Sequence, residues 1–411
     1  MVFKPSKFKY VFIGLFLALL VFGAGYEVGA KGFQANYSKG GKVTINRVAP
    51  LPDLNFSLFW KVWDVMSSSY YDKSKIVPSK MVYGAIQGMV ASLGDPYTMF
   101  LPPTQNQLTN EDLQGNFSGV GIELGYKGNQ LAVTAPLAGS PADKAGVKPG
   151  DLIVAIKDEM KKIDITTESI NLVEAVQDIR GPIATKVTLT LVREGKDKPI
   201  IVDLIRDKIN VPSVKVTYQG ENKDIAHIQI SKFGGETLNE WGKLVAEVTK
   251  KTPGVAKIIL DLRNNPGGYL QDAVDIAGEF LPRGSVVVVQ ENGDVSKHEL
   301  RTDREGALLN LKVVVLVNGG SASASEILAG ALRDDLKIKL VGDKTFGKGT
   351  IQEPQNLEGG AGLHVTIAKW LTPNGTWVHG KGLEPDVKIL QDPNSKVDDQ
   401  LNKAVQVIQS M

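Results

Sequence analysis

One stretch of the chain, Lys312–Gln352, places small polar residues at a strand-to-helix turn within an apolar sequence. Its β-branched run, Val313–Val317, predicts a buried strand that a pair of glycines ends. A helix is expected over Glu326–Arg333, followed by a second apolar strand that ends in Gly347-Lys348-Gly349. Between the first strand and the helix stand three serines at alternate positions: Ser321, Ser323 and Ser325. A hydroxyl nucleophile with a lysine base is one interpretation of this pattern.

The composition is that of a globular protein and excludes several classes of site. A chain of 411 residues predicts two to three domains, and its 42% hydrophobic and 22% charged residues suffice for a sizeable core. The net charge of +2 gives no reason to expect a nucleic-acid partner. The chain has no cysteine, so disulfides, thiolate metal sites and a cysteine nucleophile are excluded. Its four histidines lack metal-ligand spacing, so we expect no metal site and no cofactor and interpret these histidines as structural.

The N-terminus carries a targeting pattern. Three lysines precede the uncharged apolar run Tyr10–Tyr26, and this run is about as long as the roughly 17–25 residues that cross a bilayer. We therefore predict a transmembrane signal anchor over residues 1–30 with the N-terminus inside. A cleaved signal peptide, cut near Val28-Gly29-Ala30, is the alternative. Both interpretations place the body of the protein outside the cytoplasm, at the outer side of the cell membrane or released from it.

Two further segments lead into the body of the chain. Residues 31–52 contain glycine, lysine and proline without periodicity, which is typical of a linker. Residues 53–112 have helical patterns, with Asp53 as a plausible N-cap and a second helix that stops at Gly94-Asp95-Pro96. The aromatic residues of the first helix are expected to serve packing or a dimer contact.

Residues 113–206 change to short strands that alternate with turns. One helix is expected over Ser169–Ile179. In the segment Ser118–Ile122, glycines can free successive N–H groups to face an anion, and a peptide can then add as a strand beside the sheet edge. Together with the segment Ser140–Ile156, this loop resembles PDZ domains. The resemblance implies that a peptide carboxylate is bound by Val120, Gly121 and Ile122.

Residues 207–390 predict a larger α/β domain. Strands over Asp224–Phe233 and Lys257–Arg263 alternate with helices over Glu236–Lys250 and Ala273–Leu281, which indicates βαβ units and a parallel sheet. A site is expected at the carboxyl ends of its strands. Two loops follow buried strands there, and we expect them to meet at one rim: NNPGG (264–268) and NGGSASAS (318–325). Residues 391–411 predict a C-terminal helix.

Two local patterns could mislead. The segment Gly342–Lys348 matches the start of a phosphate-binding loop, but Gly349 replaces the serine or threonine that holds Mg²⁺. The segment Ser323–Glu326 has the S-x-x-E pattern of a capping box, so capping explains these serines as well as catalysis does. Chemistry alone does not choose among the three serines. Lys348 can act as a base if burial lowers its pKa.

The order of six sequence segments along the chain favours catalysis over capping alone. They resemble the carboxyl-terminal processing peptidases, also called tail-specific proteases, over roughly residues 53–390. The segments are FSGVGIEL, SPADKAGVKPGD, LDLRNNPGG, NGGSASASEILAGALRDD, GDKTFGKGTIQ and LTPNGTWVHGKGLEPDV. The resemblance implies a multidomain α/β fold: a crotonase- or ClpP-like α/β protease core, an inserted β-rich PDZ domain and an N-terminal helical segment.

The resemblance also implies roles for individual residues. It identifies Ser323 as the nucleophile of a Ser–Lys dyad, Lys348 as its base and Gln352 as the residue that orients the lysine. A shared strand face would suit positions 348 and 352. The oxyanion would be bound by the backbone of Ala324 and of a glycine of the pair Gly267 and Gly268. Arg180, in the IRGP turn, resembles an arginine that couples the PDZ domain to the protease.

The expected activity is endoproteolysis of exported proteins that are recognised by their apolar C-terminal tails. Further expected partners are the membrane, through the N-terminal helix, and a second copy or an adaptor protein. Two other functions fit parts of the pattern. One is a scaffold with a PDZ domain and no catalysis, which the intact pair Ser323 and Lys348 argues against. The other is a hydrolase of small esters or thioesters on a crotonase-like core, which the PDZ domain argues against.

Overall fold

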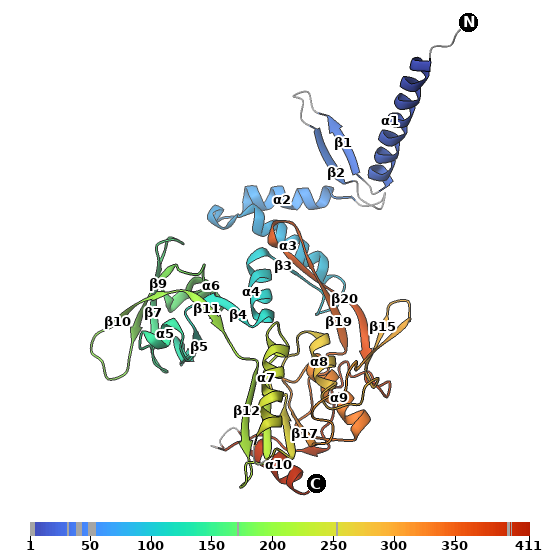
Figure 1. Cartoon of the computed structure of the whole chain (residues 1–411). Coiled ribbons are helices and arrows are strands. Elements are labelled where there is room, and N and C mark those ends of the chain that lie inside the picture. Colours follow the sequence, from blue (N-terminus) through green and yellow to red (C-terminus); the bar gives the residue numbers. More distant parts are fainter. Residues whose placement is uncertain are drawn as a thin grey trace. The chain divides into compact units, whose positions relative to one another are not determined.

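The computed structural model of the chain (Figure 1) divides it into two compact units, Met1–Val82 and Tyr83–Met411. The structure describes residues 5–30, 33–37, 43–47, 55–170, 172–251, 254–392, 395 and 397–411.

The first unit contains helices and one hairpin. Helix α1 covers Pro5–Ala30, strands β1 and β2 (Phe33–Tyr37 and Val43–Arg47) pair antiparallel, and helix α2 covers Ser57–Ser69. The hairpin stands where the sequence predicted a linker, and Asp53, the predicted N-cap, lies outside the described residues. Among the residues that the structure describes, no helix meets the length and hydropathy needed to cross a bilayer. The signal anchor stays a prediction from the sequence.

The second unit begins with α3 and a short connection to the PDZ domain. Helix α3 covers Pro78–Ala91 and straddles the division, strand β3 covers Met99–Leu101, and helix α4 covers Pro103–Gln114. Helix α4 ends at Gly115, whose left-handed φ of 75° closes the last turn.

The PDZ domain has a sheet with the order β10-β9-β7-β6-β5, and β8 pairs with β7. Alternate residues of the predicted strands fill its core, for example Leu189 and Leu191, which are fully buried. A short two-stranded ribbon of β4 and β11 joins this sheet to the rest of the unit. The elements are β4 Asn116–Gly119, β5 Ile122–Lys127, β6 Gln130–Pro136, α5 Pro141–Lys144, β7 Leu152–Asp158, β8 Ile163–Thr166, α6 Leu172–Ile179, β9 Lys186–Val192, β10 Ile200–Ile205 and β11 Asp207–Asn210.

The α/β domain is built on a six-stranded sheet with the order β12-β13-β14-β17-β18-β21. Strand β12 is antiparallel to β13, and the other neighbours are parallel, as the alternation of strands and helices predicted. Its central strands contain unbroken buried apolar runs, such as Ile258–Leu260 and Val313–Val317, because both faces of the sheet are covered. The strands are β12 Val214–Gln219, β13 Ile225–Ile230, β14 Lys257–Asp261, β17 Lys312–Val317, β18 Lys339–Gly342 and β21 Val387–Lys388.

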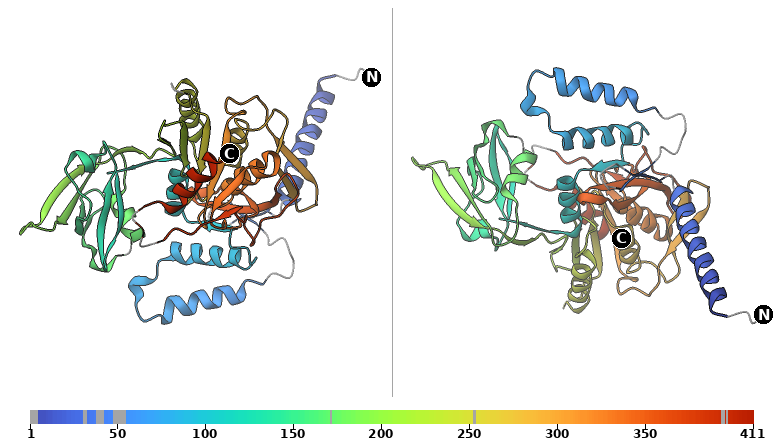
Figure 2. Two further views of the ribbon diagram at one scale, coloured as in Figure 1. Left: turned by 90° about the horizontal axis from the view of Figure 1, so that it is seen from below. Right: turned by 90° about the horizontal axis from the view of Figure 1, so that it is seen from above.

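Helices cover the two faces of this sheet unequally. One face packs against α7 (Thr237–Lys250), α8 (Leu270–Ala277) and α9 (Ala324–Leu336), with Trp241 and Phe280 among the buried side chains. The other face packs against the C-terminal helix α10 (Asp399–Gln409) through Ala404 and Ile408. Figure 2 shows α10, coloured red, beside the α/β domain in two further views.

A second, antiparallel sheet was not predicted. Its order is β16-β15-β20-β19, and β3 pairs with β20. The strands are β15 Val286–Asn292, β16 Lys297–Arg301, β19 Thr350–Asn356 and β20 Gly362–Leu371. The expectation that the second apolar strand ends in Gly347-Lys348-Gly349 is therefore wrong. Strand β18 ends at Gly342, and Lys348 lies in the loop that connects β18 to β19, between the two sheets.

Candidate active site

Two loops at the carboxyl ends of β14 and β17 are joined by hydrogen bonds, as their positions after parallel strands predicted. The N–H of Ala322 donates to the carbonyl of Asn265 at 3.0 Å. The side chains of Asn264 and Asn318 add reciprocal bonds: Asn318 Nδ2 donates to Asn264 Oδ1 at 2.9 Å, and the Asn264 N–H donates to Asn318 Oδ1 at 2.8 Å. The serine turn and the NNPGG loop therefore form one rigid rim.

The three serines have different environments. Ser321 is fully buried and donates through Oγ to the carbonyl of Leu262 at 2.8 Å. Ser325 is also fully buried and donates to the carbonyl of Asn265 at 2.9 Å. Ser323 is only partly buried and lines a cavity. Two of the serines therefore bind the neighbouring loop, and Ser323 is the one that a substrate can reach.

Ser323 also has a strained backbone. It stands immediately before α9 with φ 54° and ψ −116°, a conformation that costs a residue with a Cβ on the order of 1–3 kcal/mol. Strain of this kind persists where the surrounding structure enforces it. Here the Ser323 N–H donates to Glu326 Oε2 at 3.0 Å, which is one of the two bonds of a capping box.

Glu326 connects the serine turn to the lysine loop. Its buried carboxylate accepts hydrogen bonds from the N–H groups of Gly347 and Lys348, both at 2.8 Å, and from the hydroxyl of Thr345 at 2.5 Å. Burial raises the pKa of Glu326, while its bonds to Thr345, Lys348, Gly347 and Ser323 oppose the rise. Since all four partners are donors, the ionised carboxylate satisfies each of them.

The side chain of Lys348 lies in apolar and aromatic surroundings. Its Nζ lies 5.1 Å from the ring centroid of Tyr97, and its own carbonyl accepts a hydrogen bond from Trp370 Nε1 at 2.9 Å. Burial lowers the pKa of Lys348, and the charge of Asp95 partly opposes this. A lysine with a lowered pKa can be neutral near physiological pH and accept a proton.

A cavity of about 360 Å³ brings most of the predicted catalytic and oxyanion-binding residues together. Ser323, Lys348 and Gln352 line it, as do Gly267 and Gly268. His364 lines it as well, and burial followed by the nearby Lys348 charge lowers the pKa of this imidazole. The floor and walls are completed by Leu113, Phe233, Leu270, Ile327 and Trp370.

The two glycines of the NNPGG loop are not equivalent as donors. The Gly267 N–H donates to Asn265 Oδ1 at 2.9 Å, so it is already engaged. Gly268 forms an isolated parallel bridge with Phe233, but the two hydrogen bonds of this bridge are made by the neighbours of Gly268. The Phe233 N–H donates to the Gly267 carbonyl, and the Tyr269 N–H donates to the Phe233 carbonyl, both at 2.9 Å. This arrangement favours Gly268 as the donor of the pair.

The NNPGG loop packs so closely against neighbouring backbone that a side chain has no room at Gly267 or Gly268. Gly267 has φ +102°, and a Cβ there would lie 2.8 Å from Ser323 Cβ and 3.1 Å from the Ala324 nitrogen. Ala324 is the first residue of α9, where backbone N–H groups have no partner within the helix. The amides of Ala324 and Gly268 are therefore the candidates for an oxyanion hole.

Gln352 lines the cavity, but its predicted strand relationship to Lys348 is absent. Lys348 precedes β19, and the β19–β20 pairing shifts register between Ile351 and Gln352. The Gln352 amide nitrogen donates to the hydroxyls of Thr350 at 2.9 Å and Thr366 at 3.1 Å. Because the amide nitrogen is used in these bonds, the carbonyl oxygen of Gln352 is the end of the side chain that can accept a hydrogen bond from Lys348.

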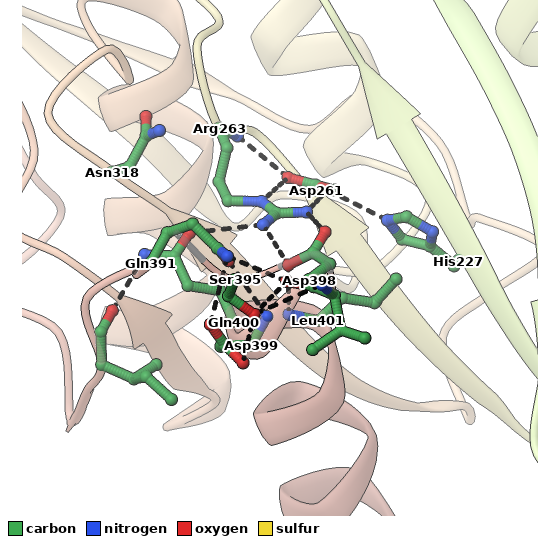
Figure 3. A network of polar contacts seen from close by, with 12 residues as sticks. His227, Asp261, Arg263, Asn318, Gln391, Ser395, Asp398, Asp399, Gln400 and Leu401 are labelled. Carbon is green, nitrogen blue, oxygen red and sulfur yellow. Dashed lines mark hydrogen bonds and ion pairs between the residues drawn. The ribbon is translucent and has the colours of Figure 1, made fainter. Parts of the chain in front are cut away.

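A polar network at the start of the NNPGG loop connects this loop to the C-terminal helix (Figure 3). Asp261, the last residue of β14, accepts from Arg263 Nε at 2.9 Å and lies 3.0 Å from His227 Nε2. The same guanidinium donates to both carboxylate oxygens of Asp398, each at 2.8 Å, and Asp398 is the N-cap of α10. Arg263 thereby connects the C-terminal helix to the start of the loop.

The PDZ residues lie outside the cavity of Ser323. Val120 and Gly121 are buried in the turn between β4 and β5, where Gly121 has φ +72° and packs on Ser140. Ile122 begins β5. Arg180 lines a separate cavity of about 450 Å³ beside α4, where its Nη1 pairs with Glu111 Oε2 at 3.3 Å and its guanidinium lies 4.2 Å from the Phe117 ring centroid.

Sequence reasoning missed two contributors to the site. Asp95 and Tyr97 lie about 250 residues from Lys348 along the chain, which the sequence alone does not bring together. Gly94-Asp95-Pro96 indicated only the end of a helix. The capping-box pattern did point to Glu326 but not to its bonds with the lysine loop.

Comparison with known proteins identifies the domains of the chain. Three family models match the chain: peptidase family S41 over residues 224–389, the activating protease CtpB N-terminal domain over 33–103, and a PDZ domain over 132–193. The fold and the matched domains define a serine peptidase with a PDZ domain.

The chain belongs to peptidase family S41. It is 39% identical over 346 residues to a protein of Staphylococcus aureus strain RF122 named "Probable CtpA-like serine protease", which covers 84% of this chain and 67% of that protein. A protein of the same name from Staphylococcus epidermidis is 38% identical, covering 80% of this chain and 64% of the relative. The chain thus spans about two thirds of the length of these relatives.

One solved structure supports the fold. An S41 protease structure from Bacteroides fragilis aligns with 89% of this chain and 99% of its own, with a TM-score of 0.55 and 17% identity. The predicted α/β protease core with a PDZ domain is confirmed by these matches. Membership of a peptidase family also argues against the non-catalytic scaffold and the small-ester hydrolase.

Proposed function

We propose that this S41 peptidase is an endopeptidase that uses Ser323 as its nucleophile and Lys348 as its general base. The observation that carries the proposal is the difference among the three serines: Ser321 and Ser325 are buried and bonded to the adjacent loop, whereas Ser323 lines the cavity that also holds Lys348. The burial that lowers the pKa of Lys348 supports its role as a base.

The reaction proceeds by acyl transfer. Neutral Lys348 takes the hydroxyl proton as Ser323 Oγ attacks the scissile carbonyl. The Ala324 and Gly268 amides donate to the oxyanion, and removing one such donor typically costs about 10²–10³ in rate. The Lys348 ammonium then protonates the leaving amine, and the acyl-enzyme remains on Ser323. A water that gives its proton to Lys348 hydrolyses this ester.

Gln352 has a supporting role in the proposal. Its amide nitrogen is bound by Thr350 and Thr366, so its carbonyl oxygen can accept from the lysine and fix the amine toward Ser323. Charge-assisted bonds of this kind also hold a side chain in one rotamer. Its loss is expected to lower kcat more than it changes KM.

We further propose that substrates are captured by their C-terminal tails. The PDZ domain, with Gly121 in a left-handed turn between two strands, is the module that suits a peptide carboxylate. Apolar terminal residues are the expected preference. Arg180 is proposed to transmit occupancy of the PDZ domain through its pair with Glu111 on α4, because α4 also supplies Leu113 to the cavity of Ser323.

Substrates are proposed to be exported proteins, because the lysines and apolar run at the N-terminus are typical of a segment that directs export. Protease treatment of intact spheroplasts tests this location. Degradation of the peptidase by the added protease is expected, and full protection would contradict export.

One digestion experiment tests the catalytic assignment. The full chain is incubated with an unfolded protein that ends in apolar residues, beside its Ser323→Ala and Lys348→Ala variants. Both variants are expected to lose cleavage. Ser321→Ala is the control for the serine, and Lys344→Ala, an exposed lysine of the same loop that pairs with Glu384 at 2.9 Å, is the control for the base. Cleavage by Lys348→Ala but not by His364→Ala would assign the base to the histidine instead.

A further inference from the structure

The loop between α3 and β3 approaches Lys348 from outside the S41 domain. Residues 95–98 lie within the segment that matches the CtpB N-terminal model, 33–103, whereas the S41 match begins at residue 224. Strand β3 pairs antiparallel with β20, with Leu363 opposite Phe100 and His364 opposite Met99. This pairing fixes the loop beside the middle of β20, where Thr366 and His364 lie.

Tyr97 presents its ring to the lysine. The Lys348 Nζ lies 5.1 Å from the ring centroid, within the range in which a cation is attracted to an aromatic face. The ring also makes an edge contact with His379 at 6.0 Å, and His379 stacks on Trp377 at 5.1 Å. Trp377 Nε1 donates to the carbonyl of Gly349, next to the lysine. His379, stacked on Trp377, therefore packs against the ring that faces Lys348.

Asp95 is fixed by its own loop and connected to Gln352. One carboxylate oxygen accepts from the Tyr97 N–H at 3.0 Å and the other from the Thr98 hydroxyl at 2.7 Å. The Thr98 hydroxyl in turn accepts from the Thr366 N–H at 3.0 Å, and the Thr366 hydroxyl accepts from Gln352 Nε2 at 3.1 Å. Movement of Asp95 would therefore disturb both Lys348 and Gln352.

The charged groups around Lys348 make Asp95 its counter-charge. Glu326 is committed to backbone N–H groups, and His364 is disfavoured as a cation by burial and by Lys348 itself. Lys232 and Asp112, which line the same cavity, pair with each other at 3.5 Å. Burial lowers the pKa of Lys348, and Asp95 is the group whose charge raises it.

We propose that Asp95 and Tyr97 are positioning residues for the dyad, supplied by the N-terminal region of the chain. Tyr97 provides the face against which the lysine amine lies, and Asp95 stabilises the ammonium that forms each time Lys348 takes a proton. The S41 domain alone then lacks both positioning residues. This inference rests on the proposed Ser–Lys mechanism.

The test is the pH profile of kcat and kcat/KM for the full chain and four variants, with the unfolded apolar-tailed substrate. Asp95→Asn removes the charge and keeps an acceptor for the Tyr97 N–H, while its NH₂ group takes the place of the oxygen that accepts from the Thr98 hydroxyl. Asp294→Asn is the matched control, because Asp294 also accepts the N–H two residues ahead at 3.0 Å, in the β15–β16 turn. Tyr97→Phe keeps the aromatic face and Tyr97→Leu removes it. Melting curves check that each variant is folded.

The acid limb of the profile is expected to move to lower pH by about one unit in Asp95→Asn, because the protonated lysine loses its counter-charge. It should not move in Asp294→Asn. Tyr97→Phe should behave like the wild type, and Tyr97→Leu should lose at least about tenfold in kcat with little change in KM. If Asp95→Asn fails to fold, the comparison of the two Tyr97 variants decides alone.

An acid limb that stays in place in folded Asp95→Asn would overturn the inference, as would full activity of Tyr97→Leu. Neither result affects the proposed function, provided that Ser323→Ala and Lys348→Ala remain inactive. Conversely, an inactive wild type, or an active Ser323→Ala, would contradict the proposed function itself.

Discussion

The backbone N–H groups of Ser323 and Lys348 donate to the same atom, Oε2 of Glu326, at 3.0 and 2.8 Å. The proposed nucleophile and base come from two loops 25 positions apart, and one buried carboxylate holds both loops. Their relative position therefore depends less on the flexible side chains than on a shared anchor inside the fold.

Glu326→Gln is expected to reduce both activity and stability. The amide has a single acceptor oxygen, and its NH₂ group would face backbone donors. Each donor left without a partner costs about 1–3 kcal/mol. Chemical denaturation and the cleavage rate measure the two effects. Glu384→Gln, on an exposed glutamate, is the control. Wild-type stability and rate in Glu326→Gln would show that the anchor is unimportant.

Gly267→Ala is expected to abolish activity and destabilise the fold. The residue has φ +102°, and the new Cβ would meet Ser323 Cβ at 2.8 Å, so the rim must open. Gly319→Ala, in the facing loop, is the control, because the nearest atom to its Cβ would be 3.9 Å away. Cleavage rates and melting temperatures are compared for both variants. Equal effects would contradict the close approach described for Gly267.

Ser325→Ala is expected to cost stability while cleavage continues. The substitution removes one of the two hydrogen bonds to the buried carbonyl of Asn265, which still accepts from the Ala322 N–H, at a cost of about 0.5–1.5 kcal/mol. Urea denaturation gives the loss, and the turnover of the folded fraction gives the activity. An inactive variant of wild-type stability would mean that Ser325 takes part in the chemistry.

Asp272→Asn is expected to stabilise the protein at alkaline pH. Asp272 lies buried on α8 with its Oδ2 unbonded, and burial, with Asp275, raises its pKa from 3.8 to about 7. The folded state therefore favours the protonated form. Its contribution is full below about pH 4 and is lost as the pH rises through 7.

Melting temperatures of Asp272→Asn and wild type measure this effect between pH 4 and pH 8. The variant should melt at least about 2 °C higher at pH 8 and show no advantage at pH 4. An advantage that is constant with pH would rule out titration of Asp272 as its cause. Asp275→Asn offers a comparison on the same helix.

Much of the fold follows from sequence pattern, because strands such as β17 and helices such as α7 have strong periodicity. The antiparallel sheet of β15, β16, β19 and β20 does not, since its pairing is set by contacts distant in sequence. The placement of Lys348 on a strand was wrong for a local reason: the apolar run ends at Gly342, and the residues up to Gly349, including Gly347, form a loop.

The candidate site could likewise be predicted only in part from the sequence. Alternate serines before a helix indicated a functional turn, but their three hydroxyls differ in burial and in hydrogen bonding, which depend on how the NNPGG loop packs against them. The roles of Asp95 and Tyr97 depend on the pairing of β3 with β20, and no local pattern around Gly94-Asp95-Pro96 announces it.

Acyl-enzyme trapping tests the central assignment most directly. The full chain is mixed with an activated ester of a hydrophobic peptide, quenched in acid and digested with trypsin, and the peptide Val313–Arg333, which contains all three serines, is sequenced by tandem mass spectrometry. The acyl group is predicted on Ser323, strongly reduced in Lys348→Ala and absent in Ser323→Ala. An acyl group on Ser321 or Ser325, or undiminished acylation of Ser323→Ala, would contradict the assignment of Ser323 as the nucleophile.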